Sequence, residues 1–199
     1  MDEAFFLSLL RAIISLFIIV DPLGNIPIFV ALTSDLAPRS RVAAFKTAVL
    51  TGFALLLVFA AAGRWVLEIF DITLYSFKIA GGSLLLILAF ELLLRDRLDS
   101  RRLLPEESGA VPLGVPLLAG PGAITTTIII LDTMGIWIAL ISIIIVAVMT
   151  WLILKFIDPI YRFLGRVGST VISKVMAMLI AAIAVQFILE GVSEFLSES

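Results

Sequence analysis

Six long apolar stretches, separated by polar or charged connections, account for most of the chain. Each approaches or exceeds the ~20 residues that a helix needs to cross a hydrocarbon core. The stretches are continuous and do not alternate between apolar and polar positions, so they predict spanning helices rather than the strands of a barrel. We therefore expect an all-α membrane protein with six transmembrane helices. The predicted spans are 5–32, 44–62, 79–94, 111–131, 136–156 and 175–195.

Basic side chains in the connections predict how the chain is oriented. The connections between spans 1 and 2, 3 and 4, and 5 and 6 hold most of them. Because cytoplasmic loops carry an excess of Lys and Arg, we expect these three connections in the cytoplasm, both termini outside, and a multi-pass protein of the cell (plasma or inner) membrane. The residues concerned are Arg39, Arg41, Lys46, Arg95, Arg97, Arg101, Arg102, Lys155, Arg162, Arg166 and Lys174. Lys78, near the start of span 3, is interpreted as an anchor at the membrane interface.

The longest connection divides the chain into two halves. Residues 96–110 are rich in charge and include a proline and a glycine. They separate a first three-span unit, residues 1–95, from a second, residues 111–199. Homologous halves with an odd number of spans must be inverted relative to each other. The sequence therefore predicts an inverted three-plus-three repeat.

The first span of each half is interrupted by proline and glycine. Such residues also occur in membrane helices as kinks or packing points. Their presence at matching positions of the two halves, however, is typical of a transporter's binding site, where unwound helices meet near the midplane. The residues expected to interrupt the helices are Pro22, Gly24 and Pro27 in span 1, and Gly120, Pro121 and Gly122 in span 4.

Each interruption predicts a new helix start inside the membrane, with free N–H groups and a positive dipole end. Asn25 is the predicted N-cap of the half-helix in span 1, and Thr125 and Thr126 are expected in the first turn after Gly122. Helix N-termini of this kind favour a carboxylate, which we expect to meet the N–H groups of residues 122–125 and those around Asn25. The side chains of Asn25, Thr125 and Thr126 add hydrogen bonds, and the close backbone favours a small ligand.

Asp21 is the most informative side chain of span 1. It follows a long apolar run, so we expect it inside the bilayer, where a charge is costly, near the negative end of a half-helix dipole. These conditions suit a group that binds and releases H⁺. Coordination of Na⁺ with freed carbonyl oxygens, and capping of the interrupted backbone, stay open as alternatives. Arg11 lies roughly 15 Å away along a straight helix, too far for direct pairing.

The composition excludes several classes of function. Apolar residues make up 61% of the chain and charged residues 15%, against roughly 45–50% and 25% in soluble domains. A net charge of −2 gives no electrostatic basis for binding nucleic acid. Without cysteine or histidine, the chain has no disulfide, no thiolate nucleophile, no zinc site of the usual kind and no Ser-His-Asp triad. We expect no catalytic residue, no metal site and no cofactor.

Two motifs together resemble the signature motifs of the MarC family of integral membrane proteins, which includes the SnatA-type small neutral amino acid transporters. They are DPLGNIPIF at 21–29 and GPGAITT at 120–126, with Gly81–Gly82 between them. The resemblance covers essentially the whole chain. It implies transport of glycine, alanine or similar amino acids driven by an ion gradient. The residues that the resemblance implies to be functional are Asp21, Gly24, Asn25, Gly120, Gly122, Thr125 and Thr126.

One position departs from that family's pattern. Family members often have a glycine near the start of the last span, where this chain has Ala177. An extra methyl group there can alter a close helix contact, which weakens any strict equivalence with Gly81–Gly82.

The predicted function is a secondary transporter, a symporter with alternating access, that moves a small neutral amino acid with H⁺ or Na⁺ and contacts membrane lipid. Its predicted substrate-binding residues are Gly24, Asn25, Gly120, Gly122, Thr125 and Thr126. Asp21 is the predicted ion-coupling residue, and Pro22, Pro27 and Pro121 break the helices. The oligomeric state stays open.

Three rival functions compete with this prediction. The same interrupted helices suit an exporter or a channel for small metabolites or ions. A membrane enzyme would need Asp21 together with Asp132 or Glu91, which lie at different predicted depths. A structural protein has no evident use for paired interruptions.

Overall fold

The computed structural model describes residues 3–33, 36–94 and 118–198, and these residues contain helices but no strand. The predicted all-α class is thus confirmed over the described part of the chain. The predicted connection at 96–110 and the start of predicted span 4 lie outside the described residues. The helices are α1 (Glu3–Val20), α2 (Ile26–Leu32), α3 (Pro38–Ile69), α4 (Leu74–Leu94), α6 (Pro121–Met134), α7 (Ile136–Lys155) and α8 (Ile157–Glu198).

Among the described residues, five helices are individually long and apolar enough to cross a membrane. They lie within α1, α3, α4, α7 and α8, while α6 is a shorter apolar helix of 14 residues. Large apolar side chains are exposed along their outer faces, for example Leu50 at 60% and Ile87 at 57%. An apolar surface of this extent needs lipid chains around it. The chain is therefore an integral, multi-pass membrane protein.

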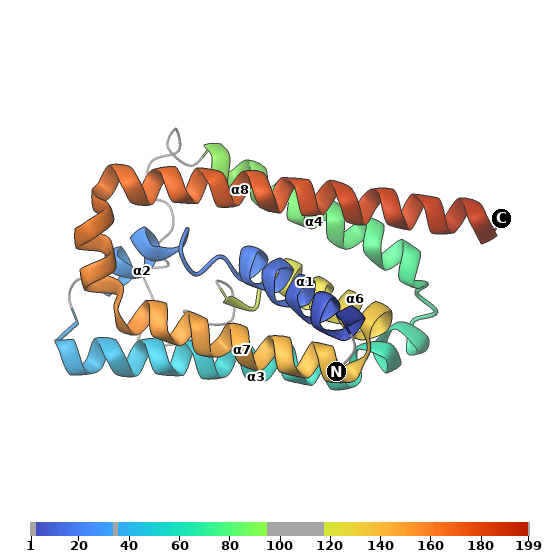
Figure 1. Cartoon of the computed structure of the whole chain (residues 1–199), viewed down its shortest axis with the longest axis horizontal. Helices are drawn as coiled ribbons and strands as arrows, with labels where there is room; N and C mark the ends of the chain where they lie inside the picture. Colours follow the sequence, from blue (N-terminus) through green and yellow to red (C-terminus); the bar gives the residue numbers. More distant parts are fainter. Residues whose placement is uncertain (1–2, 34–35, 95–117, 199) are drawn as a thin grey trace.

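The helices pair with partners that run in the opposite direction. α3 lies beside α7, α4 beside α8, and α1 beside α6 (Figure 1). The end of α8 and the start of α4 lie at one end of the bundle, here called the terminal end, and α1 begins on the same side of the molecule. The start of α3 and the α7–α8 junction lie at the opposite end, here called the basic end because it carries Arg39, Arg41 and Lys155. These basic connections thus share one end of the bundle, and its orientation toward the cytoplasm stays a prediction.

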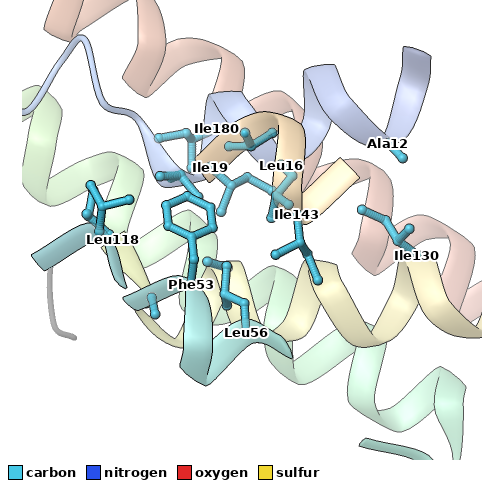
Figure 2. Packing of buried hydrophobic residues seen from close by; sticks show 14 of the residues in the cluster. Ala12, Leu16, Ile19, Phe53, Leu56, Leu118, Ile130, Ile143 and Ile180 are labelled. Carbon is cyan, nitrogen blue, oxygen red and sulfur yellow. The ribbon is translucent and has the colours of Figure 1, made fainter. Parts of the chain in front are cut away.

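A continuous apolar core joins the two halves of the chain. Side chains from α1, α3, α7 and α8 converge in its centre (Figure 2). Burial of such side chains excludes lipid and solvent from between the helices and fixes their relative positions. Residues that make up this central cluster include Leu16, Ile19, Phe53, Leu56, Ile143 and Ile180.

Helix boundaries differ from the predicted spans mainly where polar residues continue a helix beyond the apolar run. α3 extends past predicted span 44–62 at both ends, and α8 begins well before predicted span 175–195. α8 bends at Gly165, whose φ of 63° and ψ of −176° suit a residue without a Cβ. By contrast, α7 follows its predicted span closely.

Candidate functional site

The first interruption separates α1 from α2. α1 ends at Val20, α2 begins at Ile26, and the residues between them form a turn. Asp21 has a φ of 47°, in the left-handed region that residues with a Cβ rarely adopt. Its carbonyl oxygen accepts the N–H of Asn25 at 3.1 Å. Pro22 lies inside this turn, as the sequence predicts.

The side chain of Asp21 is buried within the turn, and the residue is only 3% exposed. Its Oδ1 accepts the backbone N–H of Gly24 at 2.9 Å. Its Oδ2 has no hydrogen-bond partner among the described residues. A Cβ added to Gly24 would overlap with this carboxylate. Gly24 therefore gives the carboxylate its space, and one carboxylate oxygen stays available for a proton, a cation or a ligand.

Asn25 occupies the N-cap position of α2, but its side chain makes no capping hydrogen bond. Nδ2 instead donates to the carbonyl oxygen of Val20 at 3.4 Å. Asn25 is therefore the N-cap residue, as predicted, but its amide does not cap α2, because the amide points back to a carbonyl that the end of α1 leaves free. Pro27 lies in the first turn of α2, where proline is tolerated, and thus directly follows the interruption.

The predicted second interruption immediately precedes α6, and the structure describes it from residue 118 onward. Gly120 is extended, with φ −65° and ψ 171°, and Pro121 is the first residue of the helix. The N–H groups of Ala123 and Ile124 both donate to the carbonyl oxygen of Gly120, at 3.0 and 3.1 Å. The helix start therefore already satisfies two of the N–H groups that we expected to face a ligand carboxylate.

The start of α6 lies against both α1 and α4. A Cβ added to Gly122 would overlap with Leu85 of α4 and lie 3.4 Å from Cγ2 of Ile19, in the last turn of α1. One turn along α6, a Cβ added to Gly81 of α4 would overlap with Thr125. The second interruption thus packs against the helix end that leads into the first.

Three consecutive threonines follow in α6. Thr125, Thr126 and Thr127 are all buried, at 4%, 0% and 1% exposure. They lie in the second turn of α6 rather than the predicted first turn, because the helix begins at Pro121. Oγ1 of Thr126 and Oγ1 of Thr127 have no hydrogen-bond partner among the described residues. Thr127 was not predicted, although it extends the same run of hydroxyl side chains.

Ser173 of α8 contacts the first interruption from the other half of the chain. Its Oγ donates to the carbonyl oxygen of Gly24 at 2.6 Å. This bond satisfies a carbonyl in the turn between α1 and α2. Sequence reasoning missed Ser173 because no local pattern relates it to Gly24. Ala177, one turn further along α8, is fully buried.

Lys78 of α4 is buried and forms an ion pair that the sequence did not predict. The residue is 2% exposed, and its Nζ pairs with Glu194 of α8 and lies 3.9 Å from Glu190. The interpretation of Lys78 as an interface anchor is therefore wrong, since its ammonium group faces α8 rather than lipid headgroups. Lys78 and Glu194 also line a cavity of about 490 Å³ at the terminal end.

A second ion pair joins the halves at the basic end. The Arg41 guanidinium of α3 contacts Asp158 of α8 at 2.7 Å, and its Nε donates to Oγ1 of Thr33 at 2.8 Å. The same guanidinium lies 5.6 Å from the centre of the Phe45 ring, which packs edge-on against Phe29 of α2. α2 is thereby tied to α3 and α8.

The family of this chain follows from comparison with known proteins. Residues 6–196 match the model of the family described as "MarC family integral membrane protein". The chain belongs to the MarC family. This match confirms the resemblance carried by the motifs at 21–29 and 120–126, and it spans both interruptions and both ion pairs.

Several MarC relatives are similar over nearly their whole length. A UPF0056 membrane protein of Archaeoglobus fulgidus is 36% identical, with 98% of this chain and 97% of the relative covered. A UPF0056 membrane protein of Methanocaldococcus jannaschii is 32% identical, with 96% of this chain and 98% of the relative covered. A UPF0056 membrane protein of Buchnera aphidicola is 30% identical, with 94% of this chain and 93% of the relative covered. These names describe membrane proteins and give no substrate. No solved structure matches the chain.

Proposed function

We propose that this MarC protein is a secondary transporter of small neutral amino acids such as glycine and alanine, coupled to a gradient of H⁺ or Na⁺. The observation that carries the proposal is the Asp21 carboxylate. It is buried in the turn between α1 and α2, with one oxygen bonded to Gly24 and the other without a partner among the described residues. A buried ionised oxygen without a partner is costly, so a proton or cation that binds there gains stabilisation.

The contacts around the two interruptions support a shared binding site. Gly122, at the start of α6, packs against Ile19 at the end of α1, and hydroxyl groups of Thr126 and Thr127 are buried near this start without partners in the described chain. Buried hydroxyls need hydrogen bonds, which the ammonium and carboxylate groups of an amino acid can provide. A Cβ added to Gly81 or Gly122 would overlap with Thr125 or Leu85, so the helices pack closely here, and we propose that only a small amino acid fits between them.

The antiparallel pairing of the helices supports an inverted three-plus-three repeat as the architecture of this site. α3 with α7 and α4 with α8 pair first-half helices with second-half helices of opposite direction (Figure 1). Each half also contacts the interruption of the other: Gly81 of α4 meets Thr125, and Ser173 of α8 meets Gly24. Reciprocal contacts of this kind are expected when two inverted repeats enclose one site.

Ion pairs at both ends supply the elements of alternating access. Arg41–Asp158 joins the halves at the basic end, and Lys78–Glu194 joins them at the terminal end. We propose that the protein opens one end at a time, by separating one ion pair while the other stays closed. The basic end faces the cytoplasm in this proposal, so that both termini lie outside.

Counterflow tests this proposal against the alternative, an exporter or channel with the same interrupted helices. Proteoliposomes are loaded with unlabelled glycine and diluted into a trace of labelled glycine. A carrier gives transient accumulation of label that saturates with glycine concentration and also occurs with alanine. Flux that rises linearly with concentration and gains nothing from the preload would instead identify a channel.

A further inference from the structure

The cavity at the terminal end is separate from both interruptions. It has a volume of about 490 Å³, within the range of small-molecule sites. Its walls come from the start of α4 and the ends of α6 and α8, and we call it the terminal cavity. The residues that line it are Thr73, Leu74, Tyr75, Lys78, Asp132, Thr133, Glu194 and Ser197.

Charges of both signs lie within this cavity. Lys78 is 2% exposed and pairs with Glu194, whose side chain is 43% exposed. Asp132 lines the same cavity, and Glu190 lies 3.9 Å from the Lys78 ammonium. A simple metal cation is disfavoured beside the buried ammonium of Lys78, and a simple anion is disfavoured beside the carboxylates. A ligand that carries one positive and one negative group is complementary to the charged side chains of the cavity.

We infer that the terminal cavity is an access site that binds the ammonium and carboxylate groups of a free amino acid. The ligand carboxylate binds Lys78, and its ammonium group binds Glu194 and Asp132. Such a ligand inserts between Lys78 and Glu194 and leaves each of them paired, so separation of the ion pair leaves no buried charge without a partner. Ligand binding and the opening of the terminal end are thereby the same event. The choice of glycine as ligand rests on the proposed function.

Thiol labelling tests this inference directly, because the natural chain has no cysteine. Thr133→Cys places one thiol in the wall of the terminal cavity, and Glu68→Cys places one at an exposed position of α3 at the same end. Each purified variant in detergent is reacted with a charged, water-soluble thiol reagent. Glycine at ten times its Kd is expected to slow the reaction at Thr133→Cys about tenfold and to leave Glu68→Cys unchanged.

Ligand analogues and two further substitutions define what is recognised. Glycinamide lacks the carboxylate and acetate lacks the ammonium group, so neither should protect Thr133→Cys at the same concentration. Lys78→Met with Glu194→Leu replaces the ion pair by apolar side chains of similar size, a change that proteins often tolerate, and should abolish protection by glycine. Asp21→Asn should retain the protection, because Asp21 lies outside the cavity.

The results separate this inference from the proposed function. Equal protection by glycine and acetate, or protection that survives Lys78→Met with Glu194→Leu, would overturn it. Absence of protection in a protein that transports glycine would overturn it too and leave the proposed function intact. Protection in a protein that transports no glycine would contradict the proposed function and still support a zwitterion site in the terminal cavity.

Discussion

The two helix interruptions of this MarC protein are built from different chemistry. The first, between α1 and α2, holds the buried carboxylate of Asp21, and one oxygen of this carboxylate accepts a hydrogen bond from the backbone N–H of Gly24 in the same turn. The second, before α6, holds no charge; it has glycine packed against neighbouring helices and buried threonine hydroxyls. Under the proposed function, the difference predicts a division of roles, in which the first interruption binds an ion and the second provides a small, close-fitting surface for the substrate. Substitutions at each interruption should therefore change different steps of transport.

Filling the second interruption is expected to have the largest effect. Gly122→Leu places a side chain where Leu85 and Ile19 already lie. Displacement of the α6 start by about 1 Å is expected to lower glycine uptake about 100-fold. Uptake of labelled glycine into proteoliposomes measures this effect. Gly168→Leu is the matched control, because a Cβ there meets only Leu164, at 3.4 Å and beyond. Equal uptake by both variants would show that the second interruption is not part of the binding site.

A smaller substitution at the first interruption should weaken coupling more than exchange. Gly24→Ala forces the Asp21 carboxylate from its position, at a strain of about 1–3 kcal/mol. Gradient-driven accumulation of glycine should fall about tenfold, which corresponds to about 1.4 kcal/mol. Exchange of labelled for unlabelled glycine, measured in the same vesicles, should fall less.

A double variant checks that this effect passes through the carboxylate. If Gly24→Ala acts by moving Asp21, adding it to Asp21→Asn should cause little further loss of glycine exchange, because the two changes share one interaction. Additive losses would mean that Gly24 acts independently of Asp21.

Removal of the hydrogen bond that Ser173 of α8 donates to the first interruption should have the smallest effect. Ser173→Ala removes the hydrogen bond to the carbonyl oxygen of Gly24, at a cost of about 1 kcal/mol of unfolding free energy. Thermal unfolding of the purified protein, followed by tryptophan fluorescence, measures the change. Ser83→Ala removes an exposed bond within α4 and should have a smaller effect. The reverse order would show that the first interruption does not depend on α8.

Local patterns in the sequence predicted those features that nearby residues determine. Pro22 and Gly24 indicated the turn after α1, because proline lacks an N–H and glycine tolerates the backbone conformations of an unwound segment. Continuous apolar residues gave the limits of α7 almost to the residue. The composition and the six apolar runs indicated a membrane protein before any contact was known.

Contacts between distant segments could not be predicted in this way. Lys78 pairs with Glu194 and Ser173 with Gly24 across more than a hundred residues. The packing of α4 against α8 brings the first pair together, and the packing of α2 against α8 brings the second together. The side chain of Asn25 was also mispredicted, because its amide has two alternatives: Oδ1 can accept a backbone N–H of α2, as in a cap, or Nδ2 can donate to the carbonyl oxygen of Val20, as it does here. Local propensity does not distinguish between them.

The most direct test of the proposed function is uptake of labelled glycine into proteoliposomes under an imposed proton gradient, a sodium gradient or neither, for the native chain and for Asp21→Asn. We predict accumulation above equilibrium with one of the two gradients, and its loss in Asp21→Asn, which removes the charge but keeps the shape of the side chain. Gradient-driven accumulation that survives Asp21→Asn would contradict the coupling role of this carboxylate. No movement of glycine in vesicles that hold folded protein would contradict the proposed function itself.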